Sequence, residues 1–214
     1  MDEHQPNWPG APGLTVRPRE RIAAGDIANT NVIEIYSHYG THVDVPWHFV
    51  DSGRTLSDLP ADAWVFDRPA LLDLPLAPDE LIAGHHLRAR SEEIRGHDLL
   101  LIGSGHERHR ADHEMYEHHG PGWSVDGART LRAEFPEVRA VALDWLSLCA
   151  VQHVEEGIGA HRVLLADGDG TYVLIFEDVR ISALAGRTPS RVYALPLLIG
   201  GLDGAPCTIL AEVD

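Results

Sequence analysis

The chain has no lysine and little basic charge of any kind. Its 17 basic residues are all arginine and stand against 33 acidic residues, which gives a formal net charge of −16. Nucleic acids and anionic membranes attract proteins through basic faces. The charge balance therefore argues against both as partners.

Cysteines and long apolar runs are also scarce. The two cysteines, Cys149 and Cys207, both lie in apolar surroundings, which predicts buried free thiols rather than a disulfide framework. No apolar run approaches the roughly 20 residues that span a bilayer. The acidic, proline-rich N-terminus does not have the pattern of a signal peptide. We therefore expect a cytoplasmic protein.

Length and pattern predict one domain of class α/β over residues 1–214. A chain of this length is at the upper end of the usual single-domain range. An irregular N-terminal arm over residues 1–30 is predicted by four prolines, which are Pro6, Pro9, Pro12 and Pro18. Beyond it, strand patterns such as 98–102 and 140–144 alternate with two or three helical stretches. This pattern predicts a mixed β-sheet with helices.

Residues 37–49, "SHYGTHVDVPWHF", gather polar groups in an unusual density. Four of them would point to one face of an extended strand, and they are His38, His42, Asp44 and His48. The residues of opposite parity would point into a core, and they are Tyr39, Val43, Val45 and Trp47. Because a straight strand rises about 3.3 Å per residue, His38 and Asp44 would be ~20 Å apart. Gly40 and Pro46 are placed to bend the chain and bring the four together.

His42 and Asp44, two residues apart, can reach one metal ion without any bend. Imidazole and carboxylate ligands without a thiolate suit zinc or manganese, and three such ligands with an open position are typical of catalytic sites. A bound cation lowers the pKa of water to about 7, and a histidine that is not a ligand can move protons. The alternative is a cluster of surface polar residues that binds nothing.

The same stretch resembles the His-x-Gly-Thr-His-x-Asp-x-Pro-x-His signature of the metal-dependent cyclase family, which includes bacterial kynurenine formamidase and isatin hydrolase. Further segments are similar to that family, and they are "NWPGAPG", "VALDWLSL", "AHRVLL", "IFEDV" and "ALPLLIGGLDGAP". The resemblance implies the swivelling β/α/β fold of the family, in agreement with the mixed pattern of strands and helices.

Position by position, the resemblance implies one or two divalent ions, Mn²⁺ or Zn²⁺. The implied metal ligands are His38, His42, Asp44, His161 and Glu177. Asp44 would bridge when two ions are bound. His48 is the implied general acid/base, and Trp8 is implied to line the pocket of a small-molecule substrate.

These residues predict a metal-dependent hydrolase of the arylformamidase type, which cleaves an amide, formamide or lactam C–N bond of a small aromatic substrate. Two alternatives stay open: a metal-dependent cyclase or dehydratase, and a non-catalytic protein that binds a metal or ligand. The histidines between 106 and 119 form either a ligand-binding helical face or a solvated loop. We also expect a homodimer, because cyclic dimers are the commonest assemblies and an arm that carries Trp8 can pack across a subunit boundary.

Overall fold

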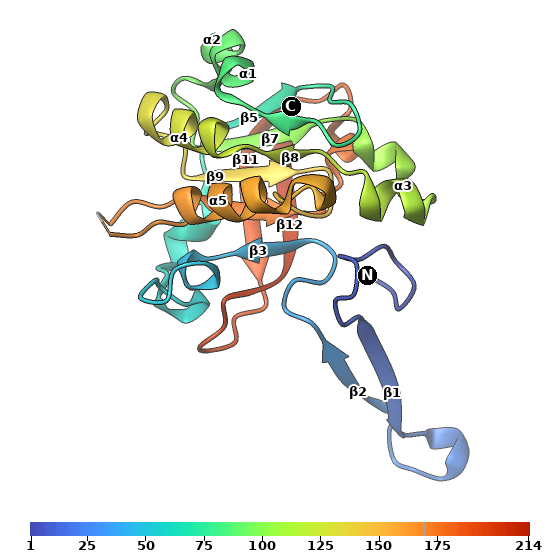
Figure 1. The fold of residues 1–214 in the computed structure, drawn as a ribbon. Coiled ribbons are helices and arrows are strands. Elements are labelled where there is room, and N and C mark those ends of the chain that lie inside the picture. The colour runs from blue at the N-terminus through green and yellow to red at the C-terminus, as the bar shows by residue number, and fades with distance from the viewer. Residues whose placement is uncertain (169) are drawn as a thin grey trace.

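The computed structural model describes residues 1–168 and 170–214 and is built around a mixed β-sheet (Figure 1). A turn that the sequence predicts at 167–170 includes residue 169 and lies outside the described residues. The strands are β1 (Leu14–Glu20), β2 (Thr30–Ile35), β3 (His42–Asp44), β4 (Val65–Phe66), β5 (Pro69–Asp73), β6 (Leu81–Ile82), β7 (Leu99–Gly103), β8 (Gly122–Trp123), β9 (Ala140–Leu143), β10 (Leu174–Glu177), β11 (Pro189–Pro196) and β12 (Gly204–Val213).

Within the described residues the main sheet has eight strands, in the order β4-β11-β12-β3-β10-β9-β7-β5. The pairs among β5, β7, β9 and β10 are parallel, and the other pairs are antiparallel. Because β11 also contacts β5, the ends of the sheet approach each other and the sheet is nearly a barrel. The predicted α/β class with a mixed sheet is confirmed.

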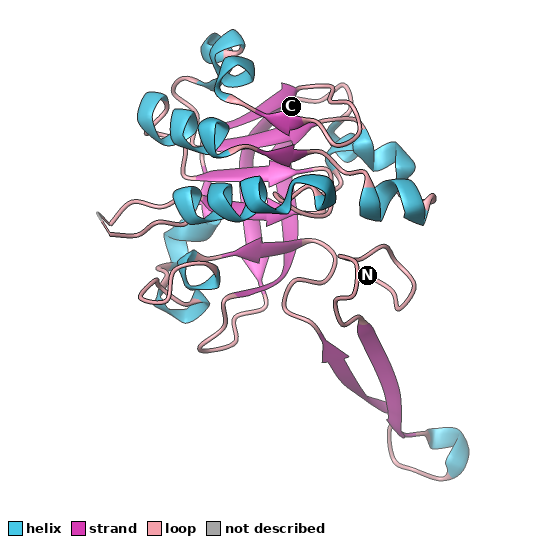
Figure 2. Ribbon diagram, viewed as in Figure 1, coloured by secondary structure: helices cyan, strands magenta, loops and turns pink. Residues whose placement is uncertain are grey.

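The helices lie over one face of the parallel strands and beside the strand ends (Figure 2). They are α1 (Gly84–Ala89), α2 (Ser91–Ile94), α3 (His113–His118), α4 (Val125–Glu134) and α5 (Val154–Leu164). Helix α4 begins after Ser124, whose side chain accepts a hydrogen bond from the Gly127 backbone N–H, as the sequence predicts for a helix start. It packs against both α1 and α5.

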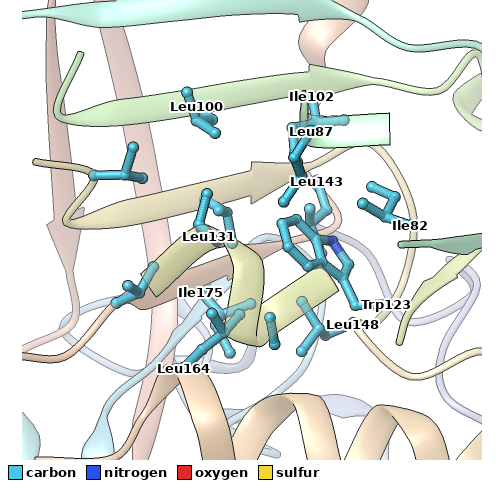
Figure 3. Packing of buried hydrophobic residues seen from close by; sticks show 14 of the residues in the cluster. Ile82, Leu87, Leu100, Ile102, Trp123, Leu131, Leu143, Leu148, Leu164 and Ile175 are labelled. Carbon is cyan, nitrogen blue, oxygen red and sulfur yellow. The ribbon is translucent and has the colours of Figure 1, made fainter. Parts of the chain in front are cut away.

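Strand β7 is buried on both faces, as a strand in a covered parallel sheet must be. Leu100 and Ile102 point to the helices, where they belong to the same apolar cluster as Leu131 of α4 and Leu164 of α5 (Figure 3). The alternate residues of β7 belong to a second cluster on the opposite face of the sheet. Each fully buried aliphatic side chain stabilises the fold by about 1.5–3 kcal/mol, so this layer holds the strands that carry the site.

The N-terminal arm is irregular only as far as residue 13, so the prediction of an irregular arm over residues 1–30 is wrong. Strand β1 pairs antiparallel with β2, and the hairpin projects away from the body (Figure 1). Pro18 interrupts the apolar alternation, which hides the strand in the sequence. The structure tolerates this proline because β1 has a partner on one side only and the register shifts between Pro18 and Glu20.

The chain bends where the glycine and proline of the histidine-rich stretch predict it. Gly40 has φ of 65°, in the left-handed region, and Pro46 begins a 3-10 turn at Pro46–His48. This turn ends the strand alternation, so the prediction that Trp47 points into a core is wrong: it is 41% exposed. The other three residues of its parity are buried, and they are Tyr39, Val43 and Val45.

The structure also bears on the predictions made from the two cysteines and from the lack of long apolar runs. Cys149 and Cys207 are both buried and free, which confirms the prediction of buried thiols. No helix among the described residues is long and apolar enough to cross a bilayer.

Gly157 of α5 lies very close to the loop after β9. A Cβ at this position would lie 2.3 Å from Cys149 Sγ and 2.5 Å from its Cα. Overpacking costs roughly 1–3 kcal/mol, whereas alanine gains at most about 1 kcal/mol of helix propensity. We therefore expect Gly157→Ala to lower Tm by about 2–8 °C, measured by thermal denaturation. Gly200→Ala is the control, because nothing lies within 4 Å of its Cβ position. A stabilised Gly157→Ala variant would contradict this packing.

The hairpin exposes apolar side chains that no other described residue buries, and they are Val16, Ile22, Ile27, Val32 and Ile33. An isolated two-stranded hairpin is marginally stable in water, so we propose that a second copy of the chain packs on it. Ile27→Asp combined with Ile33→Asp should then convert a dimer into a monomer in light scattering at micromolar concentration. Leu71→Asp, a change at a similarly apolar surface residue of β5, should leave the mass unchanged. A monomeric wild type would overturn the proposal.

Candidate active site

The candidate site lies where the short strand β3 runs between β10 and β12 in the middle of the sheet. His42 and Asp44 are two residues apart on β3 and point to the same face. The register places Glu177 of β10 directly opposite His42 and Gly204 of β12 opposite Asp44. Directly opposite residues share a face of the sheet, so Glu177 joins the pair and Asp203 lies at its edge.

Helix α5 is the third element of the site, and it contributes a side chain from its buried face. Residues spaced by three and four lie on one side of a helix, and in α5 the buried ones are Gly157, Ala160, His161 and Leu164. His161 is only 2% exposed although it is polar. Its Nδ1 lies 2.8 Å from the Gly157 carbonyl oxygen. The helical spacing therefore brings an imidazole against the sheet at Asp44.

Two backbone carbonyls decide which ring nitrogen of each buried histidine carries a proton. A carbonyl can only accept, so the Nδ1 of His161 donates to Gly157, and the Nδ1 of His42 donates to the Gly40 oxygen at 2.7 Å. The Nε2 atoms therefore face the carboxylates. That of His42 lies 3.4 Å from Asp44 Oδ1 and 3.2 Å from Glu177 Oε2. That of His161 lies 3.4 Å from Asp44 Oδ2 and 3.5 Å from Glu177 Oε1.

The geometry of these four groups fits a divalent cation. His42 Nε2 and Asp44 Oδ2 are buried and have no hydrogen-bond partner among the described residues. The separations of 3.2–3.5 Å match the roughly 3.4 Å between ligand atoms around a tetrahedral ion with bonds of about 2.1 Å. Ligand atoms of His42, Asp44 and Glu177 also lie within 4.8 Å of one another. Two imidazoles and two carboxylates thus lie 3.2–3.5 Å apart in neighbouring pairs, and His42 Nε2 and Asp44 Oδ2 are left without a partner among the described residues.

A second group of side chains lies on the other side of Asp44. His38 Nδ1 is 2.8 Å from Asp44 Oδ1, and its Nε2 is 2.7 Å from Asp203 Oδ2. His48 Nδ1 is 3.0 Å from the same Asp203 oxygen, and its Nε2 is 4.0 Å from Asp44 Oδ2. The two rings are tilted by 31° relative to each other, with centroids 4.0 Å apart. Ligand atoms of His38, Asp44 and His48 form the second cluster that could hold an ion.

Protonation in the site follows from burial and from the paired charges. Burial alone would lower the pKa of His38, but the charge of Asp44 and the hydrogen bonds with Asp44 and Asp203 raise it to about 9. Burial likewise opposes protonation of His42 and His161, yet the carboxylates raise both pKa values well above the usual range. Burial would raise the pKa of Asp44, whereas the surrounding imidazoles lower it well below its usual range. The carboxylates therefore stabilise positive charge in this space, as protons or as a cation.

The side chains face a cavity of about 260 Å³. It is lined by Asn7, Trp8, Tyr36, His38, Gly40, His42, His48, Phe49, Leu146, Ser147, Cys149, Val154, Ile158, His161 and Glu177. The structure thus brings the predicted site residues together. Asp44 is buried next to the lining residues and does not line the cavity itself. Trp8 reaches the cavity of its own chain, so this segment does not have to cross a subunit boundary.

The histidines between 106 and 119 do not line this cavity. His106 is buried and stacks on Tyr116 with ring centroids 5.2 Å apart. His113 pairs with Glu117, and His119 with Asp79, each at 3.0 Å. The segment is a 3-10 turn followed by α3.

Asp203 is the site residue that the sequence did not reveal. It lies in the glycine-rich segment "GGLDG" between β11 and β12, which reads as a turn. Its nearness to His38 and His48 depends on the pairing of β12 with β3. One signal in the sequence could have identified it. Asp203 is an acidic residue directly before β12, in the segment "ALPLLIGGLDGAP" that resembles the cyclase family.

The chain is similar in sequence and in fold to proteins of known families. A family model described as "Putative cyclase" matches residues 1–148. Cyclase-like protein 1 of Arabidopsis thaliana is 29% identical over 209 residues, which cover 94% of this chain and 77% of that protein. The kynurenine formamidase of Geobacillus thermodenitrificans is 35% identical over 65 residues, 30% of this chain and 31% of the enzyme.

Solved structures share the fold. Isatin hydrolase A from Labrenzia aggregata has a TM-score of 0.80 at 20% identity, covering 98% of this chain and 89% of that chain. A potential metal-dependent hydrolase with cyclase activity has a TM-score of 0.74 at 26% identity, covering 99% and 92%. With more than two thirds of its length matched by the family model, the chain belongs to the cyclase family.

Proposed function

We propose that this protein is a metal-dependent hydrolase that cleaves the amide, formamide or lactam C–N bond of a small aromatic molecule. The observation that carries the proposal is the convergence of two imidazole Nε2 atoms and two carboxylates beside His48 in a largely apolar cavity. Nitrogen and oxygen donors with an adjacent proton carrier suit hydrolysis. The names of two relatives, kynurenine formamidase and isatin hydrolase, support the same class of bond.

The residues that would hold the first cation are His42, Asp44, His161 and Glu177, and His38 would bind through Nδ1 beside Asp44. A divalent cation bound there, Mn²⁺ or Zn²⁺, would polarise the substrate carbonyl and lower the pKa of a water molecule. Cys149 contributes no donor, because its Sγ lies 3.7 Å from His161 Nδ1, the nitrogen turned away from the carboxylates.

His48 is placed to move the proton that the reaction requires. Its side chain is 22% exposed, so it reaches the cavity, whereas the inner histidines are almost fully buried. Its Nδ1 donates to Asp203, which leaves Nε2 free to face the cavity. This atom accepts a proton from the attacking water and, as the C–N bond breaks, transfers it to the leaving nitrogen.

The walls of the cavity favour an uncharged aromatic substrate. Trp8, Tyr36 and Phe49 supply flat apolar surface, and aromatic rings bind well against such faces. Among the described residues no arginine lines the cavity, so its walls offer no guanidinium group to pair with a substrate carboxylate. A neutral anilide or lactam therefore fits better than an amino acid such as a formylated kynurenine.

The purified protein loaded with Mn²⁺ or Zn²⁺ should hydrolyse neutral N-formyl anilines or isatin-like lactams, with release of formate or a new carboxylate. The value of kcat/KM should be lower for N-formylkynurenine, because among the described residues no arginine lines the cavity to pair with its carboxylate. Chelation should abolish turnover, and added metal should restore it. Ring closure or loss of water without a new carboxylate would support the cyclase alternative, and an absence of metal-dependent turnover on all of these compounds would contradict the proposal.

The metal part of this experiment has its own control. His42→Ala combined with Asp44→Ala should lose stoichiometric metal in elemental analysis, because two of the four converging groups are gone. His106→Ala removes a buried histidine outside the cavity and should keep the metal. Full occupancy in the double variant would rule out this set of ligands.

His48→Ala should lower kcat by about 10²–10⁴-fold, the usual contribution of a positioned acid/base, or roughly 3–5 kcal/mol at 1.36 kcal/mol per factor of ten. Its metal content should stay near that of the wild type, because His48 Nε2 lies 4.0 Å from Asp44, outside the inner cluster. Steady-state kinetics with elemental analysis measures both. If the variant lost its metal, His48 would be a ligand instead.

A further inference from the structure

Asp203 joins two histidines through a single carboxylate oxygen. Its Oδ2 lies 2.7 Å from His38 Nε2 and 3.0 Å from His48 Nδ1, and its side chain is 29% exposed. The other oxygen, Oδ1, accepts a weaker hydrogen bond from the Ser37 hydroxyl at 3.3 Å. One oxygen therefore contacts both the histidine beside Asp44 and the histidine that faces the cavity.

The backbone holds Asp203 firmly in this place. Its carbonyl oxygen accepts a hydrogen bond from the Val45 N–H at 3.1 Å. The next residue, Gly204, passes so close to β3 that a Cβ there would lie 2.5 Å from the Val43 carbonyl oxygen and 2.9 Å from His38 Cε1. Only glycine allows that approach, so the strand pairing of β12 with β3 fixes the position of the carboxylate.

A carboxylate that only accepts hydrogen bonds decides how both rings are protonated. His38 must present Nε2–H and His48 must present Nδ1–H to the shared oxygen. His38 Nδ1 is then directed at Asp44, and His48 Nε2 at the cavity. A carboxylate behind a metal-binding or catalytic histidine fixes its tautomer and ring orientation.

We propose that Asp203 is a positioning residue that orients His38 toward the metal site and His48 toward the substrate at the same time. The inference rests on the proposed function for its catalytic half, whereas its metal-binding half depends only on His38. A purely structural role in the loop before β12 is the alternative, and it makes different predictions for paired variants.

A double-mutant cycle distinguishes the two roles. At saturating metal, Asp203→Ala should lower kcat at least tenfold with little change in KM, but by no more than His48→Ala does. In the His48→Ala background the same change should cost less than about threefold, because residues that act as a unit are not additive. Losses that multiply would overturn the proposal. Asp203→Asn, which keeps the side-chain volume, repeats the cycle if the alanine variant does not fold.

Metal affinity tests the other half without any substrate. Asp203→Ala should weaken Zn²⁺ binding by about 10–100-fold in a chelator competition, as loss of a carboxylate behind a ligand does, and His48→Ala should leave it unchanged. Asp58→Ala is the matched control, because Asp58 caps the nearby turn at Thr55 and, among the described residues, forms no hydrogen bond or ion pair with a histidine. Unchanged Zn²⁺ affinity in Asp203→Ala would overturn the role at His38. Full activity in His48→Ala would refute the proposed catalytic role of His48 and leave the affinity result standing.

Discussion

A carboxylate buried in the middle of the sheet determines what the rest of the site must supply. Asp44 is 1% exposed, and a buried charge without a partner costs several kcal/mol. Four imidazoles approach it within 4.0 Å, from His38, His42, His48 and His161. Even so, one of its oxygens forms no hydrogen bond among the described residues. The fold therefore concentrates positive charge around this residue and leaves room for a cation.

The surrounding elements each deliver one side chain to the site around Asp44. Strand β10 brings Glu177 through its register with β3, α5 brings His161 on its buried face, and the loop before β12 brings Asp203. The parallel strands and helices behind them form an apolar layer that keeps these elements in place. Because protein interiors are close-packed, a displacement of one element also moves the side chain that it contributes to the site. The distances between the ligand atoms would then change.

The two sides of Asp44 differ in accessibility, and that difference separates two kinds of chemistry. The inner side, with His42, His161 and Glu177, is almost fully buried, where electrostatic interactions are stronger than in water. The outer side, with His48 and Asp203, is partly exposed, and His48 borders the cavity, as His42, His161 and Glu177 do from the inner side. Metal ligands belong on the dry side, and a group that exchanges protons with a substrate belongs on the accessible side.

The sequence by itself determined the features that depend only on interactions between neighbouring residues. The parity of His42 and Asp44, the left-handed glycine at Gly40 and the turn at Pro46 are properties of a few adjacent residues, and the α/β pattern and the family signature are likewise readable along the chain. Tertiary structure alone decided the hairpin of β1 and β2 and the place of Asp203. These depend on which strands pair and in which register, and that choice is set by contacts between residues far apart in the chain, as when β12 aligns with β3 and carries Asp203 to two histidines more than 150 residues away.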